Sequence, residues 1–129
     1  MPLVHIHVIR GRNEQQTRTL LDSIHDSTVV AFDVPASDRY QILTQHDPHE
    51  IIALDTGQSM TRTNSLVMLH FVSRERTEQA KQRLYELLAA NLHRNCGVSS
   101  EDLVVTITEN GAADWSFGRG VAQFVTGEL

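Results

Sequence analysis

Lysine is almost absent from this chain of 129 residues, because Lys81 is the only one. Arginine therefore carries nearly all the positive charge, and its planar guanidinium group binds carboxylates through two parallel hydrogen bonds. Acidic residues outnumber basic ones, which gives a formal net charge of −5. A surface that binds nucleic-acid phosphates needs an excess of basic residues, so the composition argues against a general nucleic-acid partner.

Cysteine and long apolar runs are also scarce. The single cysteine, Cys96, excludes a disulfide within the chain and suits a reducing compartment. No apolar run approaches the ~18 residues that a membrane-spanning helix needs, and no basic segment followed by an apolar stretch indicates a secretion signal. We therefore expect a cytoplasmic protein without a membrane partner.

Motifs for metals and phosphates are missing too. The chain has seven histidines, but no HExxH motif and no Cys/His spacing of a zinc site accompanies them. The turn Arg10-Gly11-Arg12 lacks the spacing of a phosphate-binding loop. The sequence therefore predicts no metal and no bound cofactor.

The chain runs twice through a strand, a helix and a strand, with a polar segment between the two halves. Its composition, 40% hydrophobic and 21% charged, is that of one globular domain over residues 1–129. Apolar residues at a period of two predict strands, and apolar spacings of three and four predict helices. The expected strands cover residues 1–9, 39–44, 65–72 and 103–108, and the expected helices cover residues 14–32 and 77–95.

Two such β-α-β units predict an α+β fold, in which one four-stranded mixed sheet has both helices on one face. The other face would be apolar and bare, so we expect further copies of the chain to cover it. Within the loop of residues 46–64, the apolar residues 51–54 predict a minor strand. Gly118 and Gly120 suit a tight turn, and residues 114–125 therefore predict a C-terminal hairpin that closes over a site or reaches a neighbouring subunit.

The first strand opens with Met1-Pro2, and removal of Met1 would leave the secondary amine of Pro2 at the end of a core strand. A free α-amine titrates near pH ~8; burial or nearby cations lower its pKa, whereas a carboxylate raises it. Pro2 would then serve as an acid, a base or a nucleophile near neutral pH. The structural alternative is that many unrelated domains begin with Met-Pro and a strand.

Three further groups are expected near Pro2. Arg74 and Arg76, two residues apart in extended chain, project to the same side and suit a carboxylate clamp. Asp38, just before the second strand, would charge or orient the Pro2 amine. An aromatic wall that excludes water is expected from Trp115, Phe117 and Phe124. The structural alternatives are a solvated turn in which Glu75 pairs with an arginine, an ordinary turn aspartate, and plain hairpin packing.

Taken together, these residues resemble the tautomerase superfamily and, within it, the malonate semialdehyde decarboxylase family. The resemblance covers essentially the whole chain, and it is carried by Met1-Pro2-Leu3, Asp38-Arg39-Tyr40-Gln41-Ile42, Arg74 with Arg76, Thr108-Glu109-Asn110, Asp114-Trp115-Ser116-Phe117-Gly118, Ala122-Gln123-Phe124 and Thr126-Gly127-Glu128-Leu129. It implies a cofactor-independent homotrimer in which Pro2, Asp38, Arg74 and Arg76 are catalytic. It also implies a pocket for a small carboxylate-bearing substrate, lined by Trp115, Phe117, Phe124 and Leu129. Glu75 departs from relatives that have proline between the arginines, which leaves the exact substrate open.

The activity that this resemblance implies is decarboxylation of malonate semialdehyde to acetaldehyde and CO2, with protonated Pro2 as general acid or iminium former. A cationic Pro2 would also activate a conjugated ketone for hydration, whereas a neutral Pro2 would be the base of a tautomerase. Two arginines and desolvation favour the neutral amine, and Asp38 favours the charged one, so both alternatives stay open. A non-catalytic trimeric scaffold is the third hypothesis.

Overall fold

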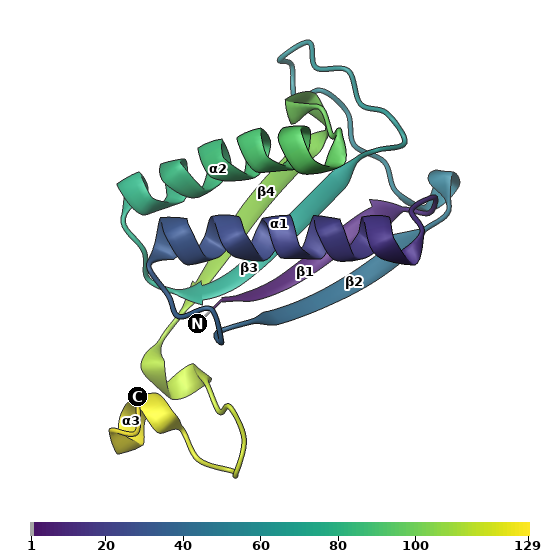
Figure 1. Cartoon of the computed structure of the whole chain (residues 1–129). Coiled ribbons are helices and arrows are strands. Elements are labelled where there is room, and N and C mark those ends of the chain that lie inside the picture. Colours follow the sequence, from purple (N-terminus) through teal and green to yellow (C-terminus); the bar gives the residue numbers. More distant parts are fainter. Residues whose placement is uncertain (1) are drawn as a thin grey trace.

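The computed structural model describes residues 2–129, in which two β-α-β units join into a single sheet (Figure 1). Met1, and with it the expected removal of the initiator methionine, lies outside the described residues. The main elements are β1 (Leu3–Ile9), α1 (Glu14–Phe32), β2 (Tyr40–His46), β3 (Val67–Arg74), α2 (Glu78–Cys96) and β4 (Leu103–Asn110). Short helical turns lie after β2 at Pro48–Glu50, before β4 at Ser100–Asp102 and after β4 at Ala112–Asp114. The chain ends after a four-residue helix, α3 (Gln123–Thr126).

Capping residues set the boundaries of both long helices. Asn13 accepts a hydrogen bond from the backbone N–H of Gln16, whose side chain accepts from the backbone N–H of Asn13. At the start of α2, the side chain of Thr77 accepts a hydrogen bond from the backbone N–H of Ala80. Gly97 ends α2 at a φ of 68°, a left-handed conformation that glycine adopts without steric cost.

The strand order of the sheet is β2-β1-β3-β4, and its pairing confirms the expected mixed sheet. Within each unit the two strands are parallel, β1 with β2 and β3 with β4. The two units meet at their first strands, β1 and β3, which are antiparallel. Corresponding strands of the two units therefore run in opposite directions, as a pseudo-twofold relation between the units requires.

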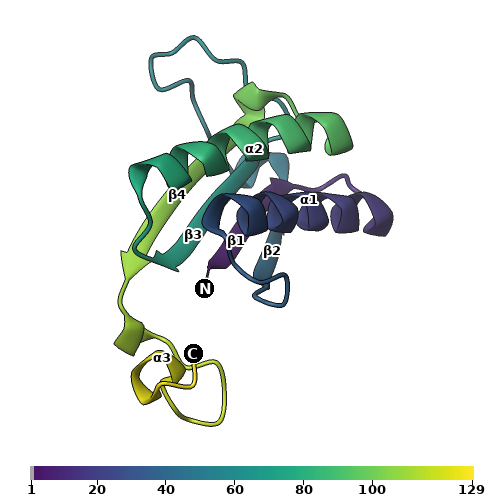
Figure 2. The same cartoon turned by 60° about the vertical axis from the view of Figure 1, so that its left-hand side comes forward.

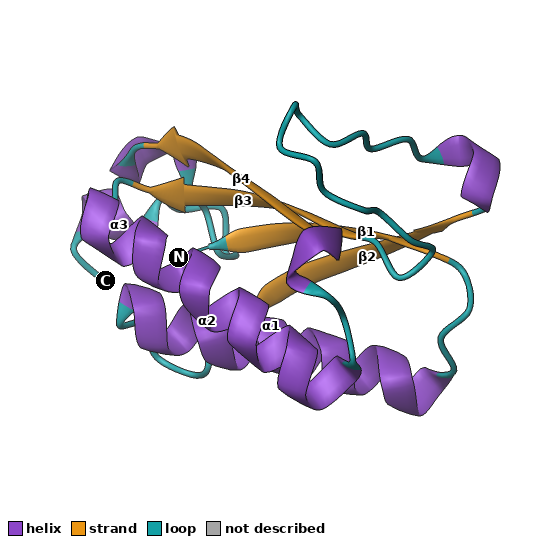
Figure 3. Cartoon of the chain, turned by 90° about the horizontal axis from the view of Figure 1, so that it is seen from above, coloured by secondary structure: helices purple, strands orange, loops and turns teal. Residues whose placement is uncertain are grey.

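The core lies between the sheet and the two long helices, which cover the same face of the sheet (Figure 3). Side chains alternate between the two faces of a strand, so Val4, Ile6 and Val8 of β1 are buried against the helices. Ile24 of α1 and Leu88 of α2 are fully buried in the same cluster. Among residues 2–129, no helix has both the length and the apolar character needed to span a bilayer.

Two expectations about irregular segments are wrong. Residues 51–54 form no strand, and Ile52 and Leu54 expose 80% and 78% of their surface in the loop between β2 and β3. An apolar run forms a strand only where a neighbouring strand pairs with its backbone. Within the described residues the ladders involve only β1 to β4, so this run stays irregular.

The expected C-terminal hairpin is also absent from the described residues, and the segment after β4 instead forms helical turns and a loop. Gly118, Arg119 and Gly120 have φ values of 129°, 63° and 71°, and three successive positive values turn the chain more tightly than a paired strand allows. The side chain of Gln123 replaces the missing strand partner, since it accepts from Phe117 N at 3.0 Å and donates to Gly118 O at 2.9 Å.

We predict that Leu88→Ala lowers the free energy of unfolding by about 2–5 kcal/mol, because it removes a fully buried side chain between α2 and the sheet. Urea unfolding followed by circular dichroism, at one fixed protein concentration, measures the change. The control is Leu54→Ala in the exposed loop, for which we expect a change within about 0.5 kcal/mol. Equal losses in the two variants would contradict this assignment of the core.

Candidate active site

Strand directions bring four chain segments to one edge of the sheet. β1 and β2 begin at this edge because they are parallel, and β3 and β4 end there because β3 is antiparallel to β1. Pro2 precedes β1 and Asp38 precedes β2, while Arg74 ends β3 and Asn110 ends β4. The C-terminal segment continues from β4 beyond the same edge (Figure 2).

Pro2 and Asp38 lie together at a narrow cavity of about 10 Å³. Pro2 is buried, and Asp38 exposes only 7% of its surface. A turn positions Asp38, since its backbone N–H donates to Pro35 O at 2.9 Å. The cavity is also lined by His25, whose Nε2 is 2.8 Å from Ala36 O and thereby fixes the same turn. The structure therefore places Pro2 at the same cavity as a buried carboxyl group.

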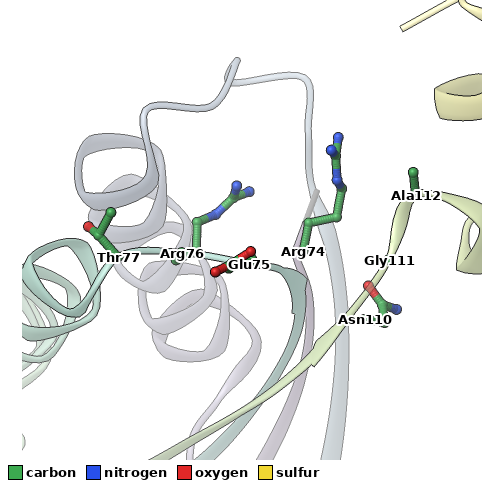
Figure 4. A pocket seen from close by; sticks show the side chains of 7 residues that line it. All are labelled: Arg74, Glu75, Arg76, Thr77, Asn110, Gly111 and Ala112. Atoms are coloured by element: carbon green, nitrogen blue, oxygen red, sulfur yellow. The ribbon is translucent and has the colours of Figure 1, made fainter.

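Arg74 and Arg76 line a wider cavity of about 530 Å³ at the same edge (Figure 4). Both side chains extend to the same side of the chain as it leaves β3, and the carboxylate of Glu75 points elsewhere between their bases (Figure 4). The remaining lining residues are Thr77, Asn110, Gly111 and Ala112. The alternation expected in extended chain therefore places both guanidinium groups on the same side of the chain (Figure 4).

Aromatic rings, rather than carboxylates, hold the two guanidinium groups. The Arg74 guanidinium lies 4.4 Å from the ring centre of Phe124, and the Arg76 guanidinium lies 5.0 Å from that of Phe32. None of the ion pairs found among residues 2–129 involves Arg74, Glu75 or Arg76. A cation stacked on an aromatic face keeps its full charge and its N–H donors, so both arginines remain available to an anion.

Arg76 shows this availability at one atom. Its Nε is buried and has no hydrogen-bond partner among residues 2–129. Burial lowers the pKa of Arg76, the neighbouring Arg74 lowers it further, and Asp38 opposes both effects. A guanidinium group stays protonated despite such shifts, so a buried N–H without a partner favours binding of an anion that supplies the missing acceptor.

An aromatic stack lies beside Arg74 and is formed by Tyr40, Trp115, Phe117 and Phe124. Phe117 is its centre, with ring centres at 5.8 Å from Tyr40, 5.3 Å from Trp115 and 5.4 Å from Phe124. Trp115 Nε1 donates to Asn110 Oδ1 at 2.7 Å, which links the stack to the end of β4. The stack therefore connects the C-terminal segment to β2, β4 and the arginines.

The structure thus groups most of the residues singled out in the sequence. Pro2 adjoins Asp38, and Phe124 adjoins Arg74. Leu129 is 62% exposed, and it is held through its backbone N–H, which donates to Gln123 O at 3.2 Å. In the single chain, Trp115, Phe117, Phe124 and Leu129 do not line the 530 Å³ cavity itself.

Sequence reasoning missed Phe32 and Asn110 as parts of this site. Phe32 ends α1 and has the pattern of a core residue, and only the helix-to-sheet packing shows that its ring also supports Arg76. Asn110 ends β4, and no spacing in the sequence predicts its bond to Trp115. The signal that could have found Asn110 is the topology: β3 and β4 are parallel, so their carboxyl ends, with Arg74 and Asn110, must lie at the same edge of the sheet.

We predict that Gln123→Ala loosens the C-terminal segment, because it removes the buried side chain that fixes Phe117 and Gly118. The free energy that holds the C-terminal segment in its folded position should fall by about 1–3 kcal/mol. Trp115 is the only tryptophan, so its emission should shift to longer wavelength and acrylamide should quench it more strongly. The control is Gln58→Ala in the exposed loop before β3, which should leave both the emission wavelength and the quenching of Trp115 unchanged. An unchanged emission spectrum in Gln123→Ala would refute the role of Gln123 in fixing this segment.

Family models described as "Tautomerase enzyme" match residues 38–118 and residues 2–58. The chain is 49% identical to the probable tautomerase YrdN of Bacillus subtilis (strain 168), and the match covers 100% of both chains. It is 34% identical over 126 residues to the probable tautomerase YusQ of the same strain, with 97% of this chain and 99% of YusQ covered.

Solved structures agree with these matches. A structure of malonate semialdehyde decarboxylase, described as a basis for decarboxylase and hydratase activities, is 46% identical with a TM-score of 0.97, and 98% of each chain is covered. A second malonate semialdehyde decarboxylase, FG41, inhibited by 3-bromopropiolate, is 43% identical with a TM-score of 0.94 over 98% of this chain and 97% of that one. A macrophage migration inhibitory factor-like protein from Entamoeba histolytica, 12% identical, shares the fold at a TM-score of 0.66, covering 91% of this chain and 95% of its own. The chain is therefore a member of the tautomerase superfamily, with a fold very close to that of malonate semialdehyde decarboxylase.

Proposed function

We propose that this tautomerase-superfamily enzyme decarboxylates malonate semialdehyde (3-oxopropanoate) to acetaldehyde and CO2 without a cofactor. The observation that carries the proposal is the pair of guanidinium groups at the Pro2 edge of the sheet, neither of which forms an ion pair with a carboxylate among residues 2–129. The likeness to malonate semialdehyde decarboxylase over 98% of the chain supports it.

Arg74 and Arg76 would bind the carboxylate of the substrate. A guanidinium group meets a carboxylate with two parallel N–H donors, and the unpartnered Nε of Arg76 supplies one such donor from a buried position. Fixing the carboxylate orients the bond that breaks relative to the carbonyl group, which receives the electrons. The stacking of both arginines on aromatic rings restrains that orientation.

Pro2 would provide the electron sink. As the C1–C2 bond of the substrate breaks, its electron pair moves toward the aldehyde oxygen, and the protonated amine of Pro2 stabilises the developing charge by donating a hydrogen bond. Condensation of the neutral amine with the aldehyde, with loss of water, would give an iminium ion that accepts the same electrons. The enol or enamine then takes a proton at C2, and hydrolysis of the iminium completes the second route.

Asp38 would keep Pro2 in its charged form. Burial of the amine and the two nearby guanidinium groups favours the neutral form, because both raise the free energy of another cation. A buried carboxyl group that shares a cavity with Pro2 opposes this. The neighbouring aromatic stack would exclude water and favour departure of neutral CO2 over retention of the charged carboxylate.

Tautomerisation or hydration with the same proline is the second candidate. The curated relatives YrdN and YusQ are both named as probable tautomerases, and the decarboxylase structure is described with a hydratase activity as well. A neutral Pro2 would act as the base on an enol or 2-oxo acid, and a cationic Pro2 would activate a conjugated ketone for addition of water. A non-catalytic scaffold is the third candidate.

We also propose that the chain assembles as a homotrimer. Structures of fused 4-OT, which share this fold at 16–20% identity, include ones described as trimers. The face of the sheet opposite α1 and α2 is covered by neither of these two long helices (Figure 3). Leu129 and Val125 of the C-terminal segment are 62% and 63% exposed, so neighbouring copies would also cover that segment.

The test is turnover of malonate semialdehyde by Met1-trimmed protein, measured as the release of acetaldehyde and CO2. Pro2→Ala should remove the activity, and Arg76→Ala should lower kcat/KM by about 10²–10³-fold, because each variant loses a group that acts in the transition state. The control is Arg83→Ala, an exposed arginine on α2, which should retain full activity.

The result also separates the candidates. Absence of turnover on malonate semialdehyde would refute the decarboxylase proposal. Pro2-dependent turnover of enol or 2-oxo acids by the same preparation would then establish a tautomerase or hydratase. No turnover of any of these substrates would leave the non-catalytic scaffold as the remaining candidate.

A further inference from the structure

The two arginines at the site are supported by different parts of the chain. The Arg74 guanidinium lies 4.4 Å from the ring centre of Phe124, which belongs to the four-residue helix α3 in the C-terminal segment. The Arg76 guanidinium lies 5.0 Å from the ring centre of Phe32, the last residue of the long helix α1. One arginine therefore depends on a short terminal segment, and the other depends on the core of the domain.

Phe32 offers Arg76 a surface that the core holds in place. Only 6% of Phe32 is exposed, and it packs in the same buried cluster as residues of β1, β3 and both long helices. Its ring centre lies 6.3 Å from that of the fully buried Phe71, with the two planes inclined by 70° in an edge-to-face arrangement. Close packing leaves a buried ring few other orientations, so the ring that Arg76 contacts is fixed.

The backbone at Phe32 is fixed as well. Helix α1 ends there because Asp33 adopts a left-handed conformation at a φ of 51°, and the backbone N–H of Asp33 donates to Val29 O. The chain then continues through the turn that carries Asp38, whose backbone N–H donates to Pro35 O at 2.9 Å. The end of one helix thus places both the ring of Phe32 and the buried carboxyl group of Asp38.

No carboxylate of the described residues holds Arg76 in place of this ring. Glu75 is its neighbour in the chain, and Asp38 is near enough to raise the pKa of Arg76, yet neither forms an ion pair with it. The Nε of Arg76 is buried and has no hydrogen-bond partner among residues 2–129. Positioning of this guanidinium group therefore falls to its contact with Phe32 rather than to a carboxylate.

An aromatic ring suits this task because it leaves the hydrogen-bond donors free. A guanidinium group over an aromatic face is attracted by the π electrons, while its N–H groups point outward in its own plane. An ion pair would occupy the same N–H groups that a ligand carboxylate needs. Fixing the side chain beforehand also removes rotamers that binding would otherwise have to freeze. Arg76 is thereby pre-organised for a carboxylate.

We propose that Phe32 is a positioning residue, whose ring holds Arg76 as the fixed arm of the carboxylate clamp, while Arg74 is the arm that moves with the C-terminal segment. Phe32 acts through Arg76, because Arg76 lines the cavity of about 530 Å³ and Phe32 does not. The inference rests on the carboxylate-binding role proposed above for the two arginines, and not on the reaction that follows binding.

Heteronuclear NMR of the isotope-labelled full chain tests this at the side chain itself, because relaxation of each arginine Nε–H signal reports how rigidly that side chain is held. The variants Arg76→Lys and Arg74→Lys each remove one signal and so assign it. The binding probe is 3-hydroxypropanoate, a carboxylate with the carbon skeleton of the substrate and no aldehyde to react. In the wild type we expect a rigid Arg76 Nε–H group whose signal shifts as the probe binds.

Phe32→Leu removes the aromatic face and keeps a buried apolar side chain. The Nε–H group of Arg76 should become as mobile as that of the exposed Arg83, and the dissociation constant of the probe should rise about 3- to 30-fold. The control is Leu92→Ala, which removes a buried side chain near the other end of α2 and should leave both quantities unchanged. Gln123→Ala, which loosens the C-terminal segment, should mobilise Arg74 but not Arg76.

A double variant separates positioning from a general effect on the fold. If Phe32 acts through Arg76, its ring contributes nothing once Arg76 is gone. Phe32→Leu/Arg76→Ala should therefore bind the probe within about twofold of Arg76→Ala alone. If far-UV circular dichroism shows that Phe32→Leu does not fold, Phe32→Met is held to the same criteria, because its flexible side chain fills the space without an aromatic face.

Three results would overturn the role of Phe32: unchanged Arg76 mobility and probe binding in Phe32→Leu, equal losses in Leu92→Ala, or the same loss from Phe32→Leu without Arg76 as with it. Mobilisation of Arg76 by Gln123→Ala would contradict the division into a fixed arm and a moving arm. Failure of the wild type to bind the probe would refute the clamp and this inference with it. Normal binding without turnover of malonate semialdehyde would refute the reaction alone.

Discussion

The antiparallel pairing of β1 with β3 is the constraint on which the rest of this structure depends. Each β-α-β unit alone has the starts of its two strands at one edge and their ends at the other. Joining the units through their first strands reverses one relative to the other, so the starts of β1 and β2 meet the ends of β3 and β4. Pro2, a buried carboxyl group and two arginines therefore lie at one edge of the sheet without any long loop to carry them.

The same pairing divides the sheet into two chemically different faces. One face is apolar and covered by helices, and the other has paired histidines and no carboxylate on its described strands. Aromatic rings support the arginines at the edge between the faces, and neither arginine forms an ion pair within the described residues. Positive charge without an internal partner is costly to bury, and binding of an anionic ligand is the natural compensation.

Much of this arrangement could be predicted from the sequence, because the strands and helices have regular apolar periods and good caps. Asn13, Thr77 and Gly97 mark the helix boundaries, and the apolar run of residues 65–72 predicts the buried strand that the structure has as β3. The failures lie where structure depends on distant partners. Residues 51–54 lacked a strand to pair with, and the side chain of Gln123, which no local pattern indicates, replaced a hairpin with a looped segment. The support of Arg76 by Phe32 was equally inaccessible, since it joins residues from two different units.

Pro2 and the C-terminal segment lie close to the candidate site, which restricts how this protein can be tagged or labelled. Pro2 is buried there, and the C-terminal segment packs beside the same edge (Figure 1). An affinity tag or fluorophore fused at either end would therefore occupy the region where a ligand is expected to bind. The long loop between β2 and β3 projects from the opposite end of the sheet (Figure 1), and Ile52 and Leu54 there are largely exposed. Labels, surface attachment points and inserted peptides belong in that loop.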